Sequence, residues 1–127
     1  MEQYLIDTNV ICDYLSNAIP ADGQKFMDAV VDAIPNVSVI TQIELLCWNT
    51  NEITKQNIRN FITECNIYAI SNEVIEHCVI IRKLKKIKTP DAIIAATALC
   101  NNFTILSRNI NDFKNIKGLK HSNPWEL

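Results

Sequence analysis

The sequence predicts an α/β domain in which a central sheet of four or five mostly parallel strands lies between two layers of helices. Short β-branched or aromatic runs alternate with segments of helical periodicity along the chain. Strands that alternate with helices pair in parallel, because each helix returns the chain to the same end of the sheet. The length of 127 residues and the hydrophobic share of 48% fit one domain over residues 1–127 with one core region.

The first third of the chain is expected to form a strand followed by two helices. Residues 4–6, Tyr-Leu-Ile, are an apolar run suited to a short buried strand. Residues 10–15 have helical character and stop ahead of Pro20, which disrupts a helix interior. Residues 22–34 carry apolar side chains at helical spacing, so one face of this helix is expected to pack on the sheet.

The middle third is expected to add a second strand and two more helices. Residues 37–40, Val-Ser-Val-Ile, are largely β-branched and follow Pro35 and Asn36, which favour a turn. Helices are expected at 42–49 and 54–64, where apolar residues recur every three or four positions.

The last third is expected to hold two strands with two helices between them. Residues 67–70 form the third strand, and residues 73–87 form a helix with an apolar stripe. Residues 90–100 are nearly all apolar, which predicts a helix buried on most sides. Residues 103–106 form the fourth strand, and the tail from Lys114 onward is expected to add a short edge strand.

The composition excludes several classes of protein. Only 2 glycines are present, which argues against phosphate loops and dinucleotide-binding motifs. The 5 cysteines include no CxxC pair and are expected to be buried thiols in a reducing compartment, not a zinc site or a disulfide framework. The acidic start resembles no signal peptide, and no apolar stretch approaches the roughly 20 residues that span a bilayer. The chain is therefore expected to be cytoplasmic, without a membrane partner.

Charge is distributed unevenly along the chain. Residues 1–79 carry 3 basic side chains against 11 acidic ones, whereas residues 80–127 carry 9 basic against 3 acidic. This asymmetry is typical of a basic surface beside an acidic site, and two differently charged solvated faces would give it equally well. The densest basic run, which contains Lys85, Lys86 and Lys88, either guides phosphates or only stabilises a helix C-terminus.

Carboxylates are expected to gather where the strands end. Asp7 directly follows the first strand, Glu44 comes early in the helix after the second, and Asp91 opens the buried helix. In a parallel sheet these ends meet at one edge, and carboxylates held close together repel one another unless a cation neutralises them. Oxygen ligands favour Mg²⁺ or Mn²⁺, whereas zinc favours His or Cys. The pattern therefore predicts metal-dependent phosphodiester hydrolysis, with Asp112 as a possible further ligand.

Each of these acids also has a purely structural interpretation. Asp7 is a residue type favoured as a helix cap. Thr41 and Glu44 fit a capping box. Thr89 followed by proline and Asp91 suits the start of a helix. The apolar neighbours of Glu44 and Asp91 favour a functional site, because a carboxylate near buried surface is costly unless something neutralises it.

Four motifs, taken in order, resemble those of the PIN-domain nucleases, and their spacing resembles that of the VapC toxins of bacterial type II toxin–antitoxin systems. The motifs are LIDTNV at 5–10, TQIEL at 41–45, TPDAIIAATA at 89–98, and LSRN with DF within 106–113. The resemblance implies an endoribonuclease that uses Mg²⁺ or Mn²⁺, with Asp7, Glu44 and Asp91 as the core carboxylates. It also implies a homodimer, a cognate antitoxin whose tail occupies or distorts the site, and a structured RNA substrate, commonly transfer RNA or a ribosomal RNA loop.

One residue departs from the family pattern. Asn109 stands where many PIN domains carry a fourth acid, so catalysis with one metal ion is an alternative to catalysis with two. Ser107 replaces a frequent threonine and keeps the hydroxyl, while Thr8 and Asn9 match the motif. These four residues are expected to support the site. Arg108 is expected, with the lysines of the basic run, to contact RNA.

Three rival interpretations remain. The first is a PIN-like module that binds RNA or protein without catalysis, which Asn109 favours and the three core acids disfavour. The second is a receiver-type signalling domain, which would require paired acids after the first strand, where Asp7 stands alone. The third is a structure-specific DNA nuclease, which usually carries additional elements that a chain of 127 residues has little room for.

Overall fold

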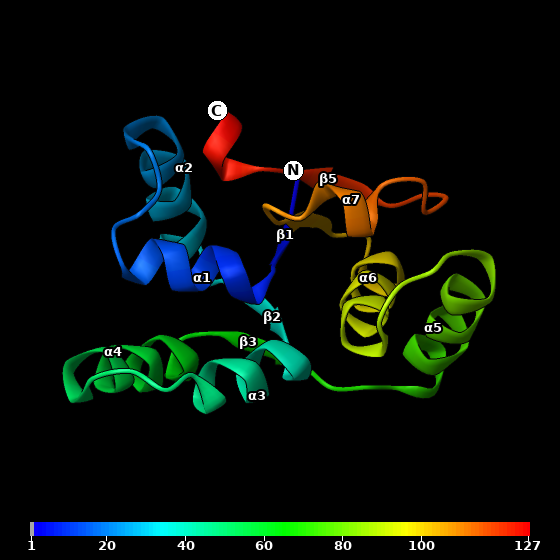
Figure 1. Cartoon of the computed structure of the whole chain (residues 1–127), viewed down its shortest axis with the longest axis horizontal. Helices are drawn as coiled ribbons and strands as arrows, with labels where there is room; N and C mark the ends of the chain where they lie inside the picture. The colour runs from blue at the N-terminus through cyan, green and yellow to red at the C-terminus, as the bar shows by residue number, and fades with distance from the viewer. Residues whose placement is uncertain (1) are drawn as a thin grey trace.

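The computed structural model describes residues 2–127, which form three layers with the sheet in the middle (Figure 1). The sheet has 5 strands in the order β3-β2-β1-β4-β5, and every neighbouring pair is parallel. The strands are β1 (Tyr4–Ile6), β2 (Asn36–Ser38), β3 (Asn66–Tyr68), β4 (Thr104–Leu106) and β5 (Lys120–Ser122). The predicted α/β class is confirmed, and β5 is the edge strand expected in the tail.

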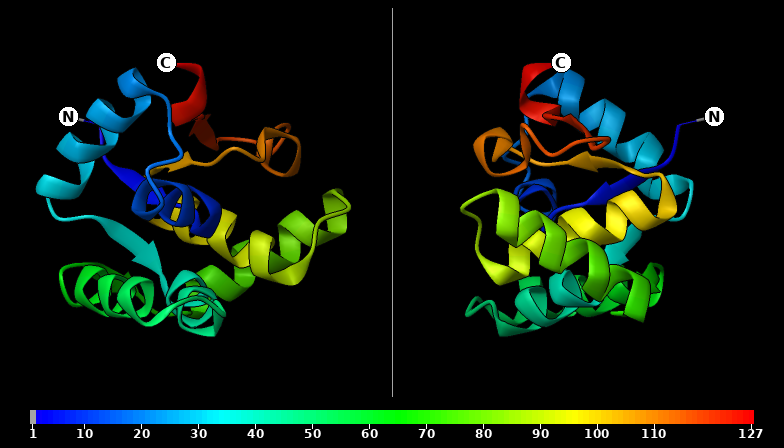
Figure 2. Two further views of the ribbon diagram at one scale, coloured as in Figure 1. Left: turned by 60° about the vertical axis from the view of Figure 1, so that its left-hand side comes forward. Right: turned by 90° about the vertical axis from the view of Figure 1, so that its right-hand side faces the viewer.

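Helices cover both faces of the sheet. They are α1 (Thr8–Leu15), α2 (Ala21–Asp32), α3 (Val39–Cys47), α4 (Glu52–Thr63), α5 (Asn72–Leu84), α6 (Thr89–Asn101) and α7 (Ile110–Phe113), with a final 3-10 turn η1 (Pro124–Glu126). Figure 1 places α1 and α2 on one side of the sheet and α5 and α6 on the other, and Figure 2 shows α5 packed along α6. None of the helices within residues 2–127 is long and apolar enough to cross a membrane.

The two central strands supply two separate cores. Successive side chains of a strand point to opposite faces, so Leu5 and Ile105 join the core under α5 and α6. Ile6 and Leu106 join the core on the other face, together with apolar residues of α1, α2 and α4. All four side chains are 0% exposed. Burial on both faces explains why these strands appear in the sequence as continuous apolar runs.

The register of β1 and β4 determines where the polar residues after them lie. Ile6 pairs with Leu106, so the next residues, Asp7 and Ser107, leave the sheet side by side. The N–H of Asp7 donates to the carbonyl of Leu106 at 2.9 Å, which extends the pairing by one residue. On the other side of β1, strand β2 ends at Ser38, and α3 begins immediately after it. Three chain segments therefore leave the carboxyl edge of the sheet next to one another.

Two predicted helix caps are wrong. The predicted strand 37–40 ends at Ser38, because the Ser38 hydroxyl accepts the N–H of Ile40 at 3.1 Å and starts α3 there. Thr41 consequently lies inside α3 and Glu44 lies in its second turn, so these residues form no capping box. Thr89 is also not a cap, because Lys88 holds the cap position of α6 without a side-chain hydrogen bond.

Other boundaries differ by a few residues. The helix predicted at 10–15 begins at Thr8, because Asp7 caps it. The helix predicted at 73–87 ends at Leu84, so Lys85 to Lys88 form a connector instead of a last helical turn. The expectation that all five cysteines are buried is wrong as well: only Cys78 is buried, although all five are free thiols.

Candidate active site

Asp7 lies at the centre of the candidate site, at the carboxyl end of β1. It is 5% exposed, and both of its carboxylate oxygens accept hydrogen bonds. Oδ1 accepts the backbone N–H of Thr8 at 2.9 Å, and Oδ2 accepts the hydroxyl of Ser107 at 2.8 Å. Asp7 is therefore a helix cap and also the most firmly held acid of the site, so the two interpretations of this residue are compatible.

The surroundings of Asp7 disfavour its negative charge. Burial raises the pKa of Asp7 above its ordinary value, while the hydrogen bonds from Ser107 and Thr8 lower it. Repulsion from the carboxylates of Glu44 and Asp112 raises the pKa further. A bound cation would remove this penalty directly.

Ser107 connects Asp7 to the loop after β4. Its side chain is 0% exposed, and its hydroxyl donates to Asp7 and accepts the N–H of Asn109 at 2.9 Å. The backbone N–H of Ser107 donates to the carbonyl of Ser122 in β5 at 3.0 Å. Ser107 is thus held by three hydrogen bonds.

Glu44 reaches the site from α3. Its Oε1 accepts the hydroxyl of Thr8 at 2.6 Å, and the hydroxyl of buried Thr41 lies 3.1 Å from the same Thr8 oxygen. Glu44 lies near Asp7, in the second turn of α3 and not in its first turn as predicted. Glu44 itself is exposed, and its neighbours Ile43 and Leu46 are 52% and 57% exposed. Thr41 supports the site through Thr8, a role that the capping interpretation concealed.

Asp91 and Asp112 enter the site from α6 and α7. Asp91 lies in the first turn of α6, and burial together with repulsion from Asp7 and Asp112 raises its pKa to about 6. Repulsion from Glu44 also raises the pKa of Asp91. The amide Nδ2 of Asn109 donates to Asp112, so Asn109 holds a fourth acid in place.

The site therefore contains an all-oxygen donor set, formed by Asp7, Glu44, Asp91 and Asp112. Such a set fits a hard cation such as Mg²⁺ or Mn²⁺. Within residues 2–127, no three of these acids have carboxylate oxygens that all lie within 4.8 Å of one another. This spread is compatible with Mg²⁺, which commonly binds through one or two carboxylates and keeps several water ligands.

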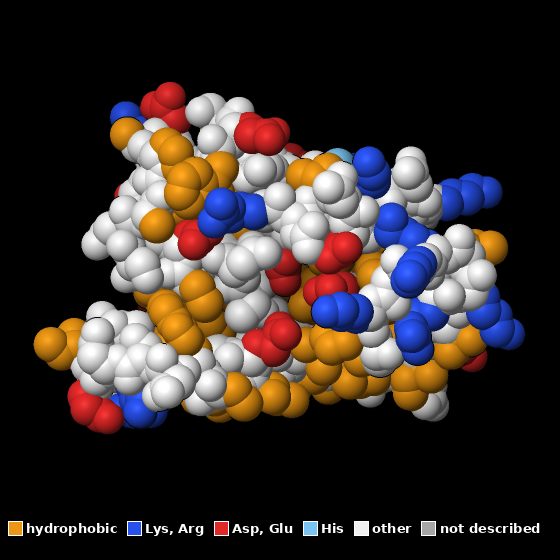
Figure 3. Space-filling view, in the orientation of Figure 1, with side chains coloured by type: hydrophobic (Ala, Val, Ile, Leu, Met, Phe, Trp, Pro, Cys, Tyr) orange, Lys and Arg blue, Asp and Glu red, His pale blue; other side chains and the backbone are white. Residues whose placement is uncertain are grey.

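Basic side chains lie beside this acidic region. In Figure 3 Lys and Arg side chains gather on the side of the molecule formed by α5, α6 and α7, next to a group of acidic side chains. Lys86 and Lys88 are exposed, whereas the ammonium group of Lys85 donates to the carbonyl of Asn111 at 3.1 Å and ties the connector to α7. Over residues 2–127 the two ion pairs that form involve none of these lysines.

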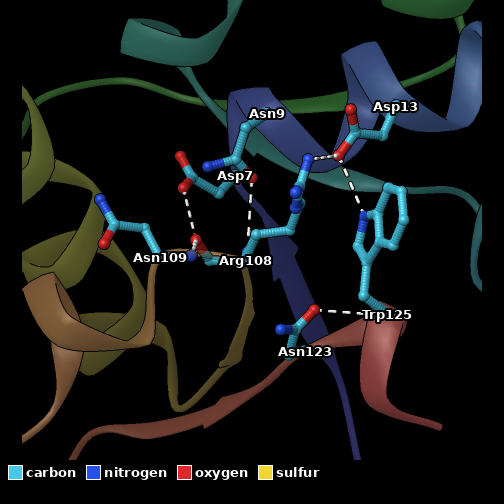
Figure 4. Close-up of polar contacts among 8 residues, drawn as sticks. Asp7, Asn9, Asp13, Arg108, Asn109, Asn123 and Trp125 are labelled. Atoms are coloured by element: carbon cyan, nitrogen blue, oxygen red, sulfur yellow. Dashed lines mark hydrogen bonds and ion pairs between the residues drawn. The ribbon is translucent and has the colours of Figure 1, made fainter. Parts of the chain in front are cut away.

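Arg108 extends toward Asp13 and Trp125, within a cluster that holds the C-terminal turn (Figure 4). Its guanidinium lies 3.1 Å from Oδ2 of Asp13 in α1 and 4.3 Å from the centre of the Trp125 ring. The indole N–H of Trp125 donates to the same Asp13 oxygen at 3.1 Å. The side chain of Asn9 accepts the backbone N–H of Arg108 at 3.5 Å. Asn9 therefore contacts the loop after β4, and the predicted RNA contact of Arg108 would compete with an internal role.

The C-terminal turn is also held by α2. A Cβ atom at Gly23 would lie 2.0 Å from the carbonyl oxygen of Pro124, so only glycine allows η1 to approach α2 this closely. Neither this contact nor the one between Asp13 and Trp125 could be predicted from the sequence, because residues 112 positions apart share no local pattern.

The sequence matches a family model described as the PIN domain over residues 4–119. The chain belongs to the PIN domain family. The predicted resemblance to VapC-type PIN nucleases is confirmed by structural matches to toxin–antitoxin complexes. One is a toxin–antitoxin complex from Klebsiella pneumoniae, which matches with a TM-score of 0.76 and 31% identity, over 98% of this chain and 100% of the other. These matches support a toxin nuclease.

Two solved structures with lower sequence identity share the fold. VapBC bound to DNA from Salmonella typhimurium matches with a TM-score of 0.80 and 20% identity, over 98% of this chain and 99% of the other. FitAcB from Neisseria gonorrhoeae matches with a TM-score of 0.78 and 24% identity, over 98% and 100%. Among curated proteins, none matches this PIN domain.

Proposed function

We propose that this PIN domain is an endoribonuclease that depends on Mg²⁺ or Mn²⁺, cuts structured RNA such as transfer RNA or ribosomal RNA, and acts as the toxin of a toxin–antitoxin pair. The observation that supports this most strongly is the meeting of four carboxylates at the carboxyl edge of the sheet, in Asp7, Glu44, Asp91 and Asp112. Burial, and then repulsion among these acids, raises the pKa of Asp7 and of Asp91, as expected of a site that binds a cation.

Asp7, Glu44 and Asp91 would each have a different role at such a metal site. A bound divalent ion would supply charge to stabilise a phosphate oxygen and would make a water more acidic. Asp7 is held by two hydrogen bonds and would fix the position of the ion. Glu44 is exposed and tied to the domain by the Thr8 hydroxyl, so it can turn toward a ligand at little cost. Asp91, with a pKa of about 6, would release a proton when a cation binds.

The substrate is inferred from the charges around the acids. The acids would repel a phosphate backbone by themselves, so binding needs nearby cations. Lys86 and Lys88 supply exposed ammonium groups on the connector that leads directly into α6 and Asp91. Lys85 contributes less to this surface, because its ammonium group is already bonded to Asn111.

The partners are inferred from the relatives and from exposed apolar surface. The Klebsiella pneumoniae relative is a toxin–antitoxin complex, and this chain covers all of the chain that it matches there. Exposed apolar residues on α3 and α4 include Ile43, Leu46 and Ile53, the last 76% exposed. Apolar surface of this kind favours contact with an antitoxin segment or with a second copy in a homodimer. We place the activity in the cytoplasm, where RNA substrates are available.

The test is cleavage of total transfer RNA and of ribosomal RNA by the purified chain, with Mg²⁺, with Mn²⁺ or with EDTA. Glu44→Gln keeps an acceptor for the Thr8 hydroxyl and removes the charge, so it should fold and lose at least ~100-fold in rate. Glu52→Gln is the matched control, because Glu52 is an exposed glutamate on α4 whose one ion pair among residues 2–127 is with Lys55.

The proposal fails if Glu44→Gln and the wild type cleave equally, or if cleavage persists in EDTA. RNA binding without cleavage under every metal condition would instead support the non-catalytic PIN-like module. The specific observation that favours this alternative is Asn109, whose amide occupies the position expected for a fourth acid.

A further inference from the structure

A second group of potential metal ligands lies between α5 and α6, outside the acidic site. Glu73 and His77 are four residues apart on α5 and therefore share one face of the helix. Cys100 faces them from the last turn of α6. One ligand atom from each of the three residues lies within 4.8 Å of the other two, and no other group of three does so in the described part of the chain.

The distance between sulfur and nitrogen fits a tetrahedral ion. Zinc bonds of about 2.3 Å to sulfur and about 2.1 Å to nitrogen, at a tetrahedral angle, place the two ligand atoms about 3.6 Å apart. Sγ of Cys100 lies 3.6 Å from Nδ1 of His77. The two ligands are thus spaced for an ion before one binds, and only the exposed carboxylate of Glu73 needs to adjust.

The hydrogen bonds within the group can be exchanged for metal bonds. Nδ1 of His77 lies 3.0 Å from the backbone carbonyl oxygen of Glu73 and 3.6 Å from the sulfur of Cys100. When an ion binds, the thiol proton passes to solvent and the imidazole proton moves from Nδ1 to Nε2. Each of the three ligand atoms then has a lone pair available to the ion.

We propose that Glu73, His77 and Cys100 bind one zinc-like divalent cation, with a water or a partner's ligand in the fourth position. Sulfur and imidazole nitrogen select zinc or cobalt and disfavour Mg²⁺, so this site and the carboxylate site take different metals. Cys100 lies nine residues after Asp91 on α6, about 14 Å along the helix, so one ion cannot serve both sites.

The ion would cross-link α5 to the helix that carries Asp91. On these two helices Val74, Cys78 and Ala96 are buried in the apolar core. Binding of this ion requires only the folded chain and no nuclease activity.

Binding can be measured with Co²⁺, which reports a sulfur ligand by its colour. Metal-free wild-type protein is kept reduced and titrated with Co²⁺ in excess Mg²⁺, which occupies the carboxylate site. We expect a sulfur-to-cobalt charge-transfer band that saturates at one equivalent and is abolished by Zn²⁺. Glu73→Gln should weaken Co²⁺ binding about 10-fold to 100-fold, and Cys100→Ser should remove the band.

Two cysteine variants serve as controls. Cys12→Ser tests the thiol that lies near Asp7 and Glu44, and Cys47→Ser tests the exposed thiol. Both variants should keep the charge-transfer band, and circular dichroism should show that all variants are folded. The proposal is overturned if the wild type gives no band, or if Cys12→Ser or Cys47→Ser removes the band and Cys100→Ser does not.

Discussion

Replacing Ser107 with alanine removes one hydroxyl that makes two hydrogen bonds at the junction of β1 and β4. The hydroxyl donates to the Asp7 carboxylate at 2.8 Å and accepts the N–H of Asn109 at 2.9 Å. Ser107 is 0% exposed, so water cannot replace the hydroxyl without rearrangement. Ser107→Ala therefore leaves a buried carboxylate and a backbone N–H each short of one partner.

The expected loss of stability follows from these two contacts. A hydrogen bond to a charged group contributes about 1.5–3 kcal/mol and a neutral one about 1 kcal/mol, so the free energy of unfolding should fall by about 2–4 kcal/mol. For a domain of 127 residues this corresponds to a decrease in Tm of about 7–15 °C. The pKa of Asp7 should rise further, because the hydrogen bond from Ser107 now lowers it.

The assay is urea denaturation of the metal-free protein at pH 7, followed by circular dichroism. Ser122→Ala is the matched control, because it removes a half-buried hydroxyl that makes no hydrogen bond among residues 2–127. In an Asp7→Asn background the cost of Ser107→Ala should shrink to about 1–2 kcal/mol, since the charged acceptor is gone. A loss below about 0.5 kcal/mol in the wild-type background would refute the view that Ser107 holds Asp7 in place.

Three further predictions concern other parts of the molecule. The metal-free protein should lose stability as the pH rises from about 4 to 7. The pKa of Asp91 is about 6 in the folded chain and 3.8 at its ordinary value in the unfolded chain, so the folded chain holds this proton more tightly and loses that advantage as the proton leaves. Urea denaturation at several pH values checks this, and Asp91→Asn or added Mg²⁺ should flatten the fall. Trp125→Ala should lower the free energy of unfolding by about 2–3 kcal/mol, because the indole ring covers the Arg108 guanidinium and the indole N–H donates to Asp13. Trp125→Phe keeps a ring and should lower it by about half as much. Equal losses in the two variants would contradict the importance of the indole N–H. Ile34→Asn should raise the free energy of unfolding by about 1 kcal/mol, because Ile34 is 58% exposed and has a φ of 65°, which is unfavourable for a β-branched residue. The other non-glycine residues with positive φ among residues 2–127 are all asparagines. A lower Tm for Ile34→Asn would count against this prediction.

The fold could be predicted from the sequence because its determinants are local. Short apolar runs such as 4–6 and 103–106 sit between helical segments, and a parallel sheet is the arrangement that buries both faces of such strands. Helix starts were harder, because several residues near each start can serve as caps. Ser38 precedes Thr41 by three residues, and both types favour the cap position. The residue at which β2 stops pairing with its neighbours decides which of the two, Ser38 or Thr41, caps α3.

The location of the acids could be predicted for the same reason, and their surroundings could not. Asp7 directly follows a strand, so the topology alone places it at the carboxyl edge of the sheet. Whether Glu44 is buried or exposed depends on which face of α3 packs on the core. In the structure Leu45 lies on that face, and Glu44 is exposed. The apolar neighbours of a residue in the sequence lie on other faces of the helix, so they do not predict its exposure.

The group of Glu73, His77 and Cys100 had no such topological signal. His77 and Cys100 are 23 residues apart and meet only because α5 and α6 pack side by side. The presence of two different donor sets changes how metal dependence must be measured, because EDTA would strip a cation from both. If EDTA abolishes cleavage and Mg²⁺ alone restores it equally in the wild type and in Cys100→Ser, the cleavage depends on the carboxylate site. Cleavage that Mg²⁺ restores only in the wild type preloaded with Zn²⁺ would mean that the link between α5 and α6 also holds Asp91 in position.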